Sequence, residues 1–317
     1  MGLKGRPLPP GGTIGVPAPA WPYYNRSDVL RGVEWWAQRG YNVKLSKGVY
    51  ARKGYVAGPA EERAEDLMAM FSDDEVDVVQ SFDAGYGSAQ MIPFIDFDVI
   101  KANPKPFLGY SDITALHQSI RHYTDLVTFY GPTLTTVYHK DTEAFTIDSM
   151  MRALTITEPL GPLPANPDND YLRPFNSGRV SGTLDGGCLW LLGQTIGTPW
   201  QVDLDGKIFF FEDVSTPPWY MDGLLNQMSQ AGLLGRVKGI VIGELEACDW
   251  RGTPHDWPAH NSIEDVLEEY IEPLGVPTIY GPPMGHGKHL LTTPLGVGVT
   301  LDADDRTLTF EEAALAY

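Results

Sequence analysis

Short apolar runs alternate with amphipathic stretches along the first 130 residues of the chain. The apolar runs predict buried strands, and the stretches between them repeat apolar residues at the helical period. Alternation of this kind favours a parallel, Rossmann-like sheet that is covered by helices on both faces. The predicted strands cover residues 13–16, 41–45, 76–81 and 107–108, and the predicted helices cover residues 27–39, 59–71 and 113–123.

A stretch rich in Pro, Asn and Asp interrupts this pattern near residues 158–178. It has no hydrophobic periodicity, which is typical of a linker or a long crossing loop. Strands are predicted beyond it at 178–184, 207–212, 237–242, 297–301 and 307–310, and helices at 186–197, 221–231 and 263–270. We therefore expect an α/β protein with an N-terminal domain over residues 1–160, a linker over 161–177 and a β-rich, mixed α/β C-terminal domain over 178–317.

The charge and the cysteines narrow the choice of partners and compartment. The formal net charge is -18, and the chain has no block of basic residues. Such a chain repels polyanions, so we expect neither nucleic acid nor an anionic membrane surface as a partner. Two cysteines, Cys188 and Cys248, cannot build a disulfide framework and lack the Cys-x-x-Cys spacing of a metal site. They predict reduced thiols in a cytoplasmic protein.

The segment around Ser111 carries the first candidate chemistry. A short apolar run ends in Gly109-Tyr110-Ser111-Asp112, and a predicted helix follows at once. A serine at such a strand-to-helix turn can be exposed as a nucleophile, with helix N-terminal amides nearby to bind an oxyanion. The alternative is that Ser111 or Asp112 merely caps the helix. Residues 83–88 also follow a predicted strand, and ligands of parallel sheets collect at such strand ends.

A serine nucleophile needs a base and a group that orients the base. Glycines flank His286 on both sides, which lets the backbone bring this histidine close to another segment. His289 lies in the same loop and is the second candidate base. Glu212 closes a strongly apolar strand, where a carboxylate is costly unless it is paired. Glu244 and Glu246 are rivals for this role, and Glu212 or Asp213 could instead cap the next turn.

Several motifs occur in a fixed order along nearly the whole chain. They are residues 95–116 around Ser111, 129–132, 186–187 with 197–199, 211–214 with Asp222, and 283–286 with 294–296. In this order they resemble the LD-carboxypeptidase family of serine peptidases, which includes the microcin C self-immunity proteins. The resemblance implies a Ser111–Glu212–His286 triad, with the nucleophile in the first domain and the other two residues in the second. It also implies no metal or organic cofactor, and commonly a homodimer.

The chemistry expected of these residues is amide hydrolysis through an acyl-serine. Ser111 would attack a carbonyl, His286 would carry the proton, and Glu212 would hold the imidazole tautomer. Backbone amides would hold the oxyanion, and we expect those of Asp112 and of the Ala84-Gly85 turn to do so.

Two departures from the family pattern bear on the substrate. Many LD-carboxypeptidases carry Arg-Gly-Gly-Tyr-Gly where this chain has Asp83-Ala-Gly-Tyr-Gly87, and the usual Gly-Gly-Asn is Gly-Gly-Cys188 here. An arginine could pair with the terminal carboxylate of a D-amino acid, whereas Asp83 would repel it. The immunity-type members also depart from the arginine pattern, and they cleave an amide that joins an acidic residue to a nucleotide-like group. Trp190 is a candidate for stacking on a nucleobase, although core packing is the alternative.

We therefore expect an immunity-like amidase that acts on aminoacyl-nucleotides or related small peptide conjugates. The alternative substrate is a murein tetrapeptide, from which the enzyme would release D-Ala. A catalytically silent protein that binds small molecules on the same scaffold is the alternative of another class.

Overall fold

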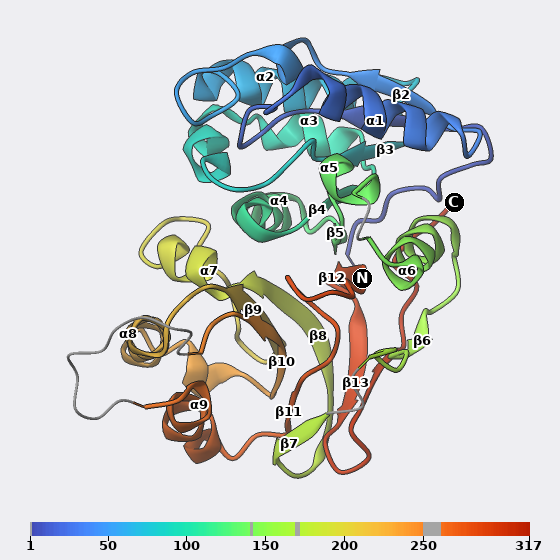
Figure 1. Cartoon of the computed structure of the whole chain (residues 1–317). Helices are drawn as coiled ribbons and strands as arrows, with labels where there is room; N and C mark the ends of the chain where they lie inside the picture. Colours follow the sequence, from blue (N-terminus) through green and yellow to red (C-terminus); the bar gives the residue numbers. More distant parts are fainter. Residues whose placement is uncertain (1, 140–141, 169–171, 250–260) are drawn as a thin grey trace. The chain divides into compact units, whose positions relative to one another are not determined.

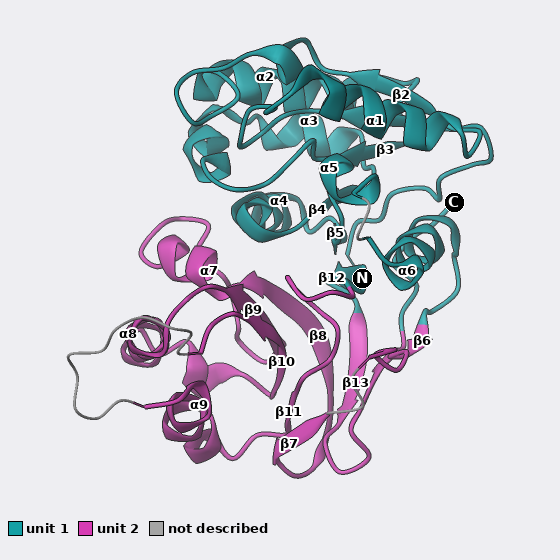
Figure 2. Cartoon of the chain, in the orientation of Figure 1, with its two compact units in different colours: residues 1–160, 290–297, 312–317 teal, residues 161–289, 298–311 magenta. Residues whose placement is uncertain are grey.

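The computed structural model describes residues 2–139, 142–168, 172–249 and 261–317. The chain forms two compact units (Figure 2). Unit 1 consists of Met1–Leu160, Leu290–Val297 and Glu312–Tyr317, and unit 2 consists of Gly161–His289 and Gly298–Glu311. Each unit has its own sheet and its own buried core. No helix in the described ranges is both long enough and apolar enough to cross a membrane.

Unit 1 contains the predicted parallel sheet (Figure 1). Its strands, in spatial order, are β12 (Thr293–Leu295), β5 (Thr128–Tyr130), β4 (Phe107–Gly109), β3 (Val78–Gln80), β1 (Thr13–Val16) and β2 (Asn42–Leu45). All neighbouring pairs are parallel except β12 with β5, which is antiparallel. The chain runs outward from β1 to β2, then returns to β3 and continues in the opposite direction. Parallel α/β sheets bind ligands where the strand order reverses in this way, here between β1 and β3.

The helices of unit 1 form two groups, as expected for right-handed crossovers that run in opposite directions along the sheet, from β1 to β2 and then from β2 back to β3. The helix α1 (Arg26–Ala37) packs against α5 (Leu134–Val137), whereas α2 (Ala60–Ser72) packs against α3 (Phe97–Ala102), which also contacts α4 (Thr114–Thr124). A sixth helix, α6, covers Ala144–Thr155. Asn25 and Asp28 form a capping box at the start of α1, and two acids lie in the first turn of α2, where the helix dipole favours negative charge.

Unit 2 contains a mixed sheet of eight strands. Their spatial order is β6 (Gly161–Pro162), β14 (Thr307–Phe310), β13 (Gly298–Asp302), β8 (Arg179–Cys188), β9 (Ile208–Val214), β10 (Gly239–Glu246), β11 (Thr278–Tyr280) and β7 (Arg173–Asn176). The four strands from β8 to β11 are parallel, and the pairs outside them are antiparallel. Central parallel strands are buried on both faces, which explains the continuous apolar run Ile-Phe-Phe-Phe of β9.

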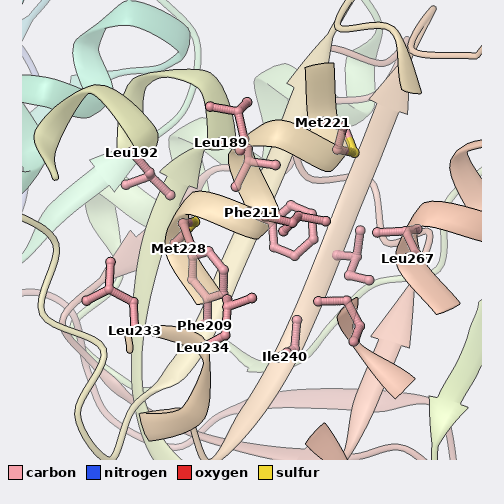
Figure 3. Packing of buried hydrophobic residues seen from close by; sticks show 14 of the residues in the cluster. Leu189, Leu192, Phe209, Phe211, Met221, Met228, Leu233, Leu234, Ile240 and Leu267 are labelled. Carbon is pink, nitrogen blue, oxygen red and sulfur yellow. The ribbon is translucent and has the colours of Figure 1, made fainter. Parts of the chain in front are cut away.

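Three helices close the hydrophobic core of unit 2 (Figure 3). They are α7 (Leu189–Thr195), α8 (Pro218–Gln230) and α9 (Ile263–Tyr270). Phe209 and Phe211 of β9 point to the same face of the sheet and pack beside Met221 and Met228 of α8. This packing fixes β9, and therefore it also fixes the acidic residues at the end of that strand.

The structure differs from the sequence-based expectation at the joins between the units. Part of the expected linker, 161–177, forms β6 and β7, which are strands of the unit 2 sheet. Part of the expected C-terminal domain returns to unit 1, because β12 pairs with β5. The helix expected from residue 186 begins at Leu189, since Gly186 and Gly187 are extended within β8. A Cβ on Gly186 would lie 1.7 Å from the carbonyl oxygen of Phe210, so only glycine permits this close strand pairing.

Candidate active site

Ser111 lies at a sharp turn between β4 and α4. Its φ angle is 60°, a left-handed conformation that side-chain-bearing residues rarely adopt. Its backbone N–H donates to the hydroxyl oxygen of Tyr130, 2.9 Å away. No side-chain capping bond is formed at the start of the helical turn Ser111–Ile113 or of α4. The strained turn is what a nucleophile elbow requires, and it distinguishes this position from an ordinary helix cap.

Asp112 connects the Ser111 turn to the turn that follows β3. Its carboxylate accepts the backbone N–H of Ser88 at 2.8 Å and that of Gly87 at 3.3 Å. The Ser88 hydroxyl donates to the Asp112 carbonyl oxygen at 2.6 Å. Burial raises the pKa of Asp112, and the bonds from Ser88 and Gly87 together with the Arg63 charge oppose that rise. Asp112, which the sequence predicts as an oxyanion donor, therefore also holds the turn at Gly87 and Ser88 in place.

The turn at residues 83–85 is held by its own side chain. Asp83 Oδ1 accepts the N–H of Ala84 at 2.8 Å and the hydroxyl of Thr135 at 2.9 Å. Burial is the main cause that raises the pKa of Asp83. The Ala84 amide, which the sequence predicts as an oxyanion donor, donates its hydrogen bond to Asp83 here. Gly85, with φ 102°, lies against Trp21, whose ring a Cβ would approach to 2.0 Å.

Glu212 and His286 form a hydrogen-bonded pair within unit 2. The Nδ1 of His286 lies 2.7 Å from Glu212 Oε2, and the backbone N–H of His286 donates to the same oxygen at 3.1 Å. Glu212 is fully buried and is followed by the last two residues of β9, Asp213 and Val214. A carboxylate on Nδ1 fixes the proton there and leaves the basic lone pair on Nε2. Burial lowers the pKa of His286, but the charge and hydrogen bond of Glu212, with Asp213, raise it above its ordinary value overall.

The rival acids have other surroundings. Asp213 accepts the backbone N–H groups of Trp190 and Val214, at 2.9 and 2.8 Å, and the hydroxyl of Thr216 at 2.9 Å. Burial, followed by the charge of Glu212, raises the pKa of Asp213 to about 6. Glu246 is exposed at the end of β10. Among the candidates, Glu212 is therefore the acid that bonds to His286.

Three further predicted residues, Cys188, Trp190 and His289, lie in unit 2. Cys188 pairs in register with Glu212 at the end of β8, is buried, and has its thiol 3.8 Å from an Asp213 oxygen. Burial, with the charges of Asp213 and Glu212, raises the pKa of the Cys188 thiol well above its ordinary value. The ring of Trp190 stacks on Tyr220 with centroids 4.5 Å apart. His289 is buried, with Nε2 3.3 Å from an Asp168 oxygen.

Sequence reasoning missed two aromatic residues. Tyr130 accepts the amide of Ser111, and Trp21 packs on Gly85. Tyr130 is the last residue of β5 and belongs to the motif at 129–132, so that motif was a usable signal. No local sequence pattern identifies Trp21, because its contact with Gly85 depends on the pairing of β1 with β3. In the ranges that the structure describes, no group of three His, Cys, Asp or Glu side chains is arranged to hold a metal ion.

Comparison with known proteins assigns both halves of the chain to the same family. Residues 14–131 match the LD-carboxypeptidase N-terminal domain, and residues 181–301 match the LD-carboxypeptidase C-terminal domain. A probable murein peptide carboxypeptidase of Bacillus subtilis (strain 168) is 36% identical over 98% of this chain and 95% of its own length. The microcin C7 self-immunity protein MccF of Escherichia coli is 28% identical, with 99% and 97% covered.

Solved structures agree with the sequence matches. MccF in complex with glutamyl sulfamoyl guanosine has a TM-score of 0.88 at 27% identity, covering 99% of this chain and 100% of that chain. A muramoyltetrapeptide carboxypeptidase from Oxalobacter formigenes has a TM-score of 0.82 at 26% identity, with 95% and 99% covered. These matches confirm the expected two-domain α/β fold. The chain belongs to the LD-carboxypeptidase family of serine peptidases.

Proposed function

We propose that this hydrolase cleaves an amide through an acyl-enzyme, with Ser111 as nucleophile, His286 as base and Glu212 as the residue that orients His286. The observation that carries the proposal is the 2.7 Å bond between Glu212 and the Nδ1 of His286, made at the residues that the family pattern assigns to acid and base. The left-handed turn at Ser111 gives independent support, because an unstrained cap would not need it.

In the proposed reaction the Ser111 hydroxyl oxygen bonds to the substrate carbonyl carbon while its proton passes to Nε2 of His286. The amides of Gly85 and Asp112 would stabilise the resulting oxyanion. The imidazolium then gives its proton to the amide nitrogen, the C–N bond breaks, and an acyl-serine remains. Water, deprotonated by His286, attacks this ester and frees Ser111. Throughout, the buried charge of Glu212 stabilises the imidazolium.

For the substrate, we propose an aminoacyl-nucleotide or a related small peptide conjugate. Asp83 supports this choice, because it supplies a carboxyl rather than a cation to the turn beside the Ser111 segment. A terminal carboxylate would have no arginine to pair with at that position. MccF, which shares the fold, has been solved with glutamyl sulfamoyl guanosine and with aspartyl sulfamoyl adenosine. Trp190, already stacked on Tyr220, is the aromatic ring we propose for a nucleobase.

A murein tetrapeptide is the second candidate. It is favoured by the 36% identity with the probable murein peptide carboxypeptidase of Bacillus subtilis. The two candidates differ in the group that leaves, which is D-Ala from murein and a nucleotide-like amine from the conjugate.

One mass-spectrometric experiment separates these candidates. Purified wild type and Ser111→Ala would each be incubated with a murein tetrapeptide, with aminoacyl sulfamoyl adenosines and with small isopeptides. We expect the wild type alone to cleave the sulfamoyl adenosines. Release of D-Ala with the sulfamoyl adenosines intact would assign the murein reaction. Cleavage of none of them, with no labelling of Ser111 by a fluorophosphonate, would identify a silent binding protein.

We also propose a homodimer in a reducing, cytoplasmic environment. The homodimer rests on the family resemblance. The environment is supported by Cys188 and Cys248, which are both buried free thiols. Light scattering on the purified protein tests the dimer.

A further inference from the structure

Each glycine that flanks His286 faces a carboxyl group from a neighbouring strand. A Cβ on Gly285 would lie 2.5 Å from Glu212 Oε2, and a Cβ on Gly287 would lie 1.6 Å from Glu244 Oε2. A side chain at either position would displace the carboxyl group that faces it. The histidine loop is therefore packed between two carboxyl groups, and the proposed mechanism uses only one of them.

A β-bulge brings the two carboxyl groups to the same end of the sheet. In the pairing of β9 with β10, Ile242 stands opposite Phe211 and Leu245 opposite Asp213. Gly243 and Glu244 thus share a single partner position, that of Glu212. Bulges re-aim side chains and are common beside active sites.

The bulge also supports the loop through its backbone. The N–H of Glu244 donates to the carbonyl oxygen of Met284 at 3.0 Å. A Cβ on Gly243 would lie 2.0 Å from that same oxygen, so the strand end and the loop are in direct contact. Met284 precedes the Gly285-His286-Gly287 segment, so Glu244 contacts the loop on both sides of His286.

The Glu244 carboxyl has few partners. Its Oε1 accepts a long bond from the Asn166 amide at 3.4 Å, and its Oε2 is buried without a hydrogen bond in the described part of the chain. Burial, followed by the charges of Glu246 and Glu212, raises the pKa of Glu244 to about 7, against the opposing effects of Asn166 and the Gly287 amide. A raised pKa favours the uncharged carboxyl, and this limits its repulsion of Glu212.

We propose that Glu244 is a positioning residue that holds the Gly287 side of the histidine loop, so that the His286 imidazole keeps its alignment with Glu212. This inference rests on the proposed function, in which His286 is the base. A catalytic group must be held to a fraction of an ångström, and small misplacements reduce the rate without weakening substrate binding. Glu244 touches no reacting atom in this role and acts through the loop.

The kinetic test compares Glu244→Ala, Glu244→Gln and the matched control Glu246→Ala, an exposed acid on the same strand. We expect Glu244→Ala to lower kcat by about 10- to 100-fold with KM changed less than about twofold. Glu244→Gln keeps the shape and the Asn166 contact, so it should restore most of kcat, and Glu246→Ala should match wild type. Wild-type kcat in Glu244→Ala, or equal loss in Ala and Gln, would overturn the proposal.

Gly287→Ala tests the same contact from the other side. Its methyl group would occupy the position of the Glu244 carboxyl, so it should lower kcat as Glu244→Ala does. This variant also serves if Glu244→Ala does not fold. A Gly287→Ala enzyme with wild-type kcat and KM would contradict the inference.

A measurement without substrate separates failure of this inference from failure of the proposed function. The His286 Nδ1 proton, bound to Glu212, should give a low-field proton NMR resonance that Glu212→Gln abolishes. We expect Glu244→Ala to broaden this resonance through faster exchange, and Glu244→Gln and Glu246→Ala to retain it. An unchanged resonance in Glu244→Ala refutes the positioning role, even if wild type cleaves none of the substrates.

Discussion

Replacing Glu212 by Gln tests the proposed acid–base pair most directly. The change keeps the size of the side chain but removes the charge that two N–H groups of His286 share, at 2.7 and 3.1 Å. A hydrogen bond to a charged group is worth about 1.5–3 kcal/mol, or about 10- to 150-fold in rate if the transition state loses one. Where the wrong imidazole tautomer results, a triad loses up to about 10⁴-fold. We therefore expect kcat/KM to fall by at least about tenfold.

The pH dependence of kcat/KM gives a second test of the pair, because the loss of the Glu212 charge should shift it in one direction. Only neutral His286 can accept the Ser111 proton, so kcat/KM rises with pH as the imidazolium deprotonates. In wild type the pKa of His286 is raised, because the effect of Glu212 exceeds that of burial. In Glu212→Gln burial remains and the charge is gone, so the rising limb should move to lower pH while the plateau falls.

The assay is kcat/KM against pH for both proteins, with circular dichroism to confirm folding. A limb that stays in place, or that moves to higher pH, would refute the assignment of Glu212 as the partner of His286. A plateau within about threefold of wild type would do the same, since a lost charged bond costs more than that.

Substitutions at three positions, Ser111, Tyr130 and Gly186, test the local structure. Ser111→Ala and Ser111→Gly should both abolish turnover and fluorophosphonate labelling. Ser111→Gly should in addition raise the free energy of unfolding by roughly 0.5–1 kcal/mol, because glycine relieves the strain of the left-handed conformation. Equal melting temperatures of the two variants would argue against strain. Tyr130→Phe removes the acceptor of the Ser111 amide, so denaturant titration should show a loss of about 1 kcal/mol, and an unchanged midpoint would show that water replaces the hydroxyl. Gly186→Ala should destabilise the protein by more than about 3 kcal/mol, because its methyl group would overlap the Phe210 carbonyl. The control Gly223→Ala, at a position in α8 that faces open space, should be neutral or stabilising. Similar melting curves of the two variants would refute the packing argument.

Much of the fold was predictable because strands and helices carry different hydrophobic periods. The helix Ile263–Tyr270 and the strand Thr307–Phe310 have the bounds that the pattern predicts. The predicted start of α7 was wrong because Gly186 and Gly187, which the pattern assigned to the helix, are extended inside β8. The strand β12 had no local signal, since its partner β5 lies far away in the sequence.

The candidate site was predictable in part for a similar reason. Gly285 and Gly287 marked His286 as a residue of close approach, and the apolar run of β9 marked Glu212 as a buried acid. Glu244 appeared only as a rival to Glu212, because a bulge that doubles one register position leaves no trace in the periodicity. Asp83 was named for its charge, whereas its bonds to Ala84 and Thr135 depend on the folded turn.

The return of the chain to unit 1 has a consequence for producing the protein in pieces. The strand β12 begins four residues after His289, and its backbone completes the ladder of β5. A polypeptide that ended at Leu160 would leave β5 as an uncovered edge, a template for edge-to-edge aggregation. Expression of the first half alone should therefore give inclusion bodies, and adding residues 290–297 as a separate peptide should recover material. During synthesis on the ribosome, the first sheet likewise stays open until Thr293–Leu295 have emerged, so chaperone dependence is expected to concentrate on β5.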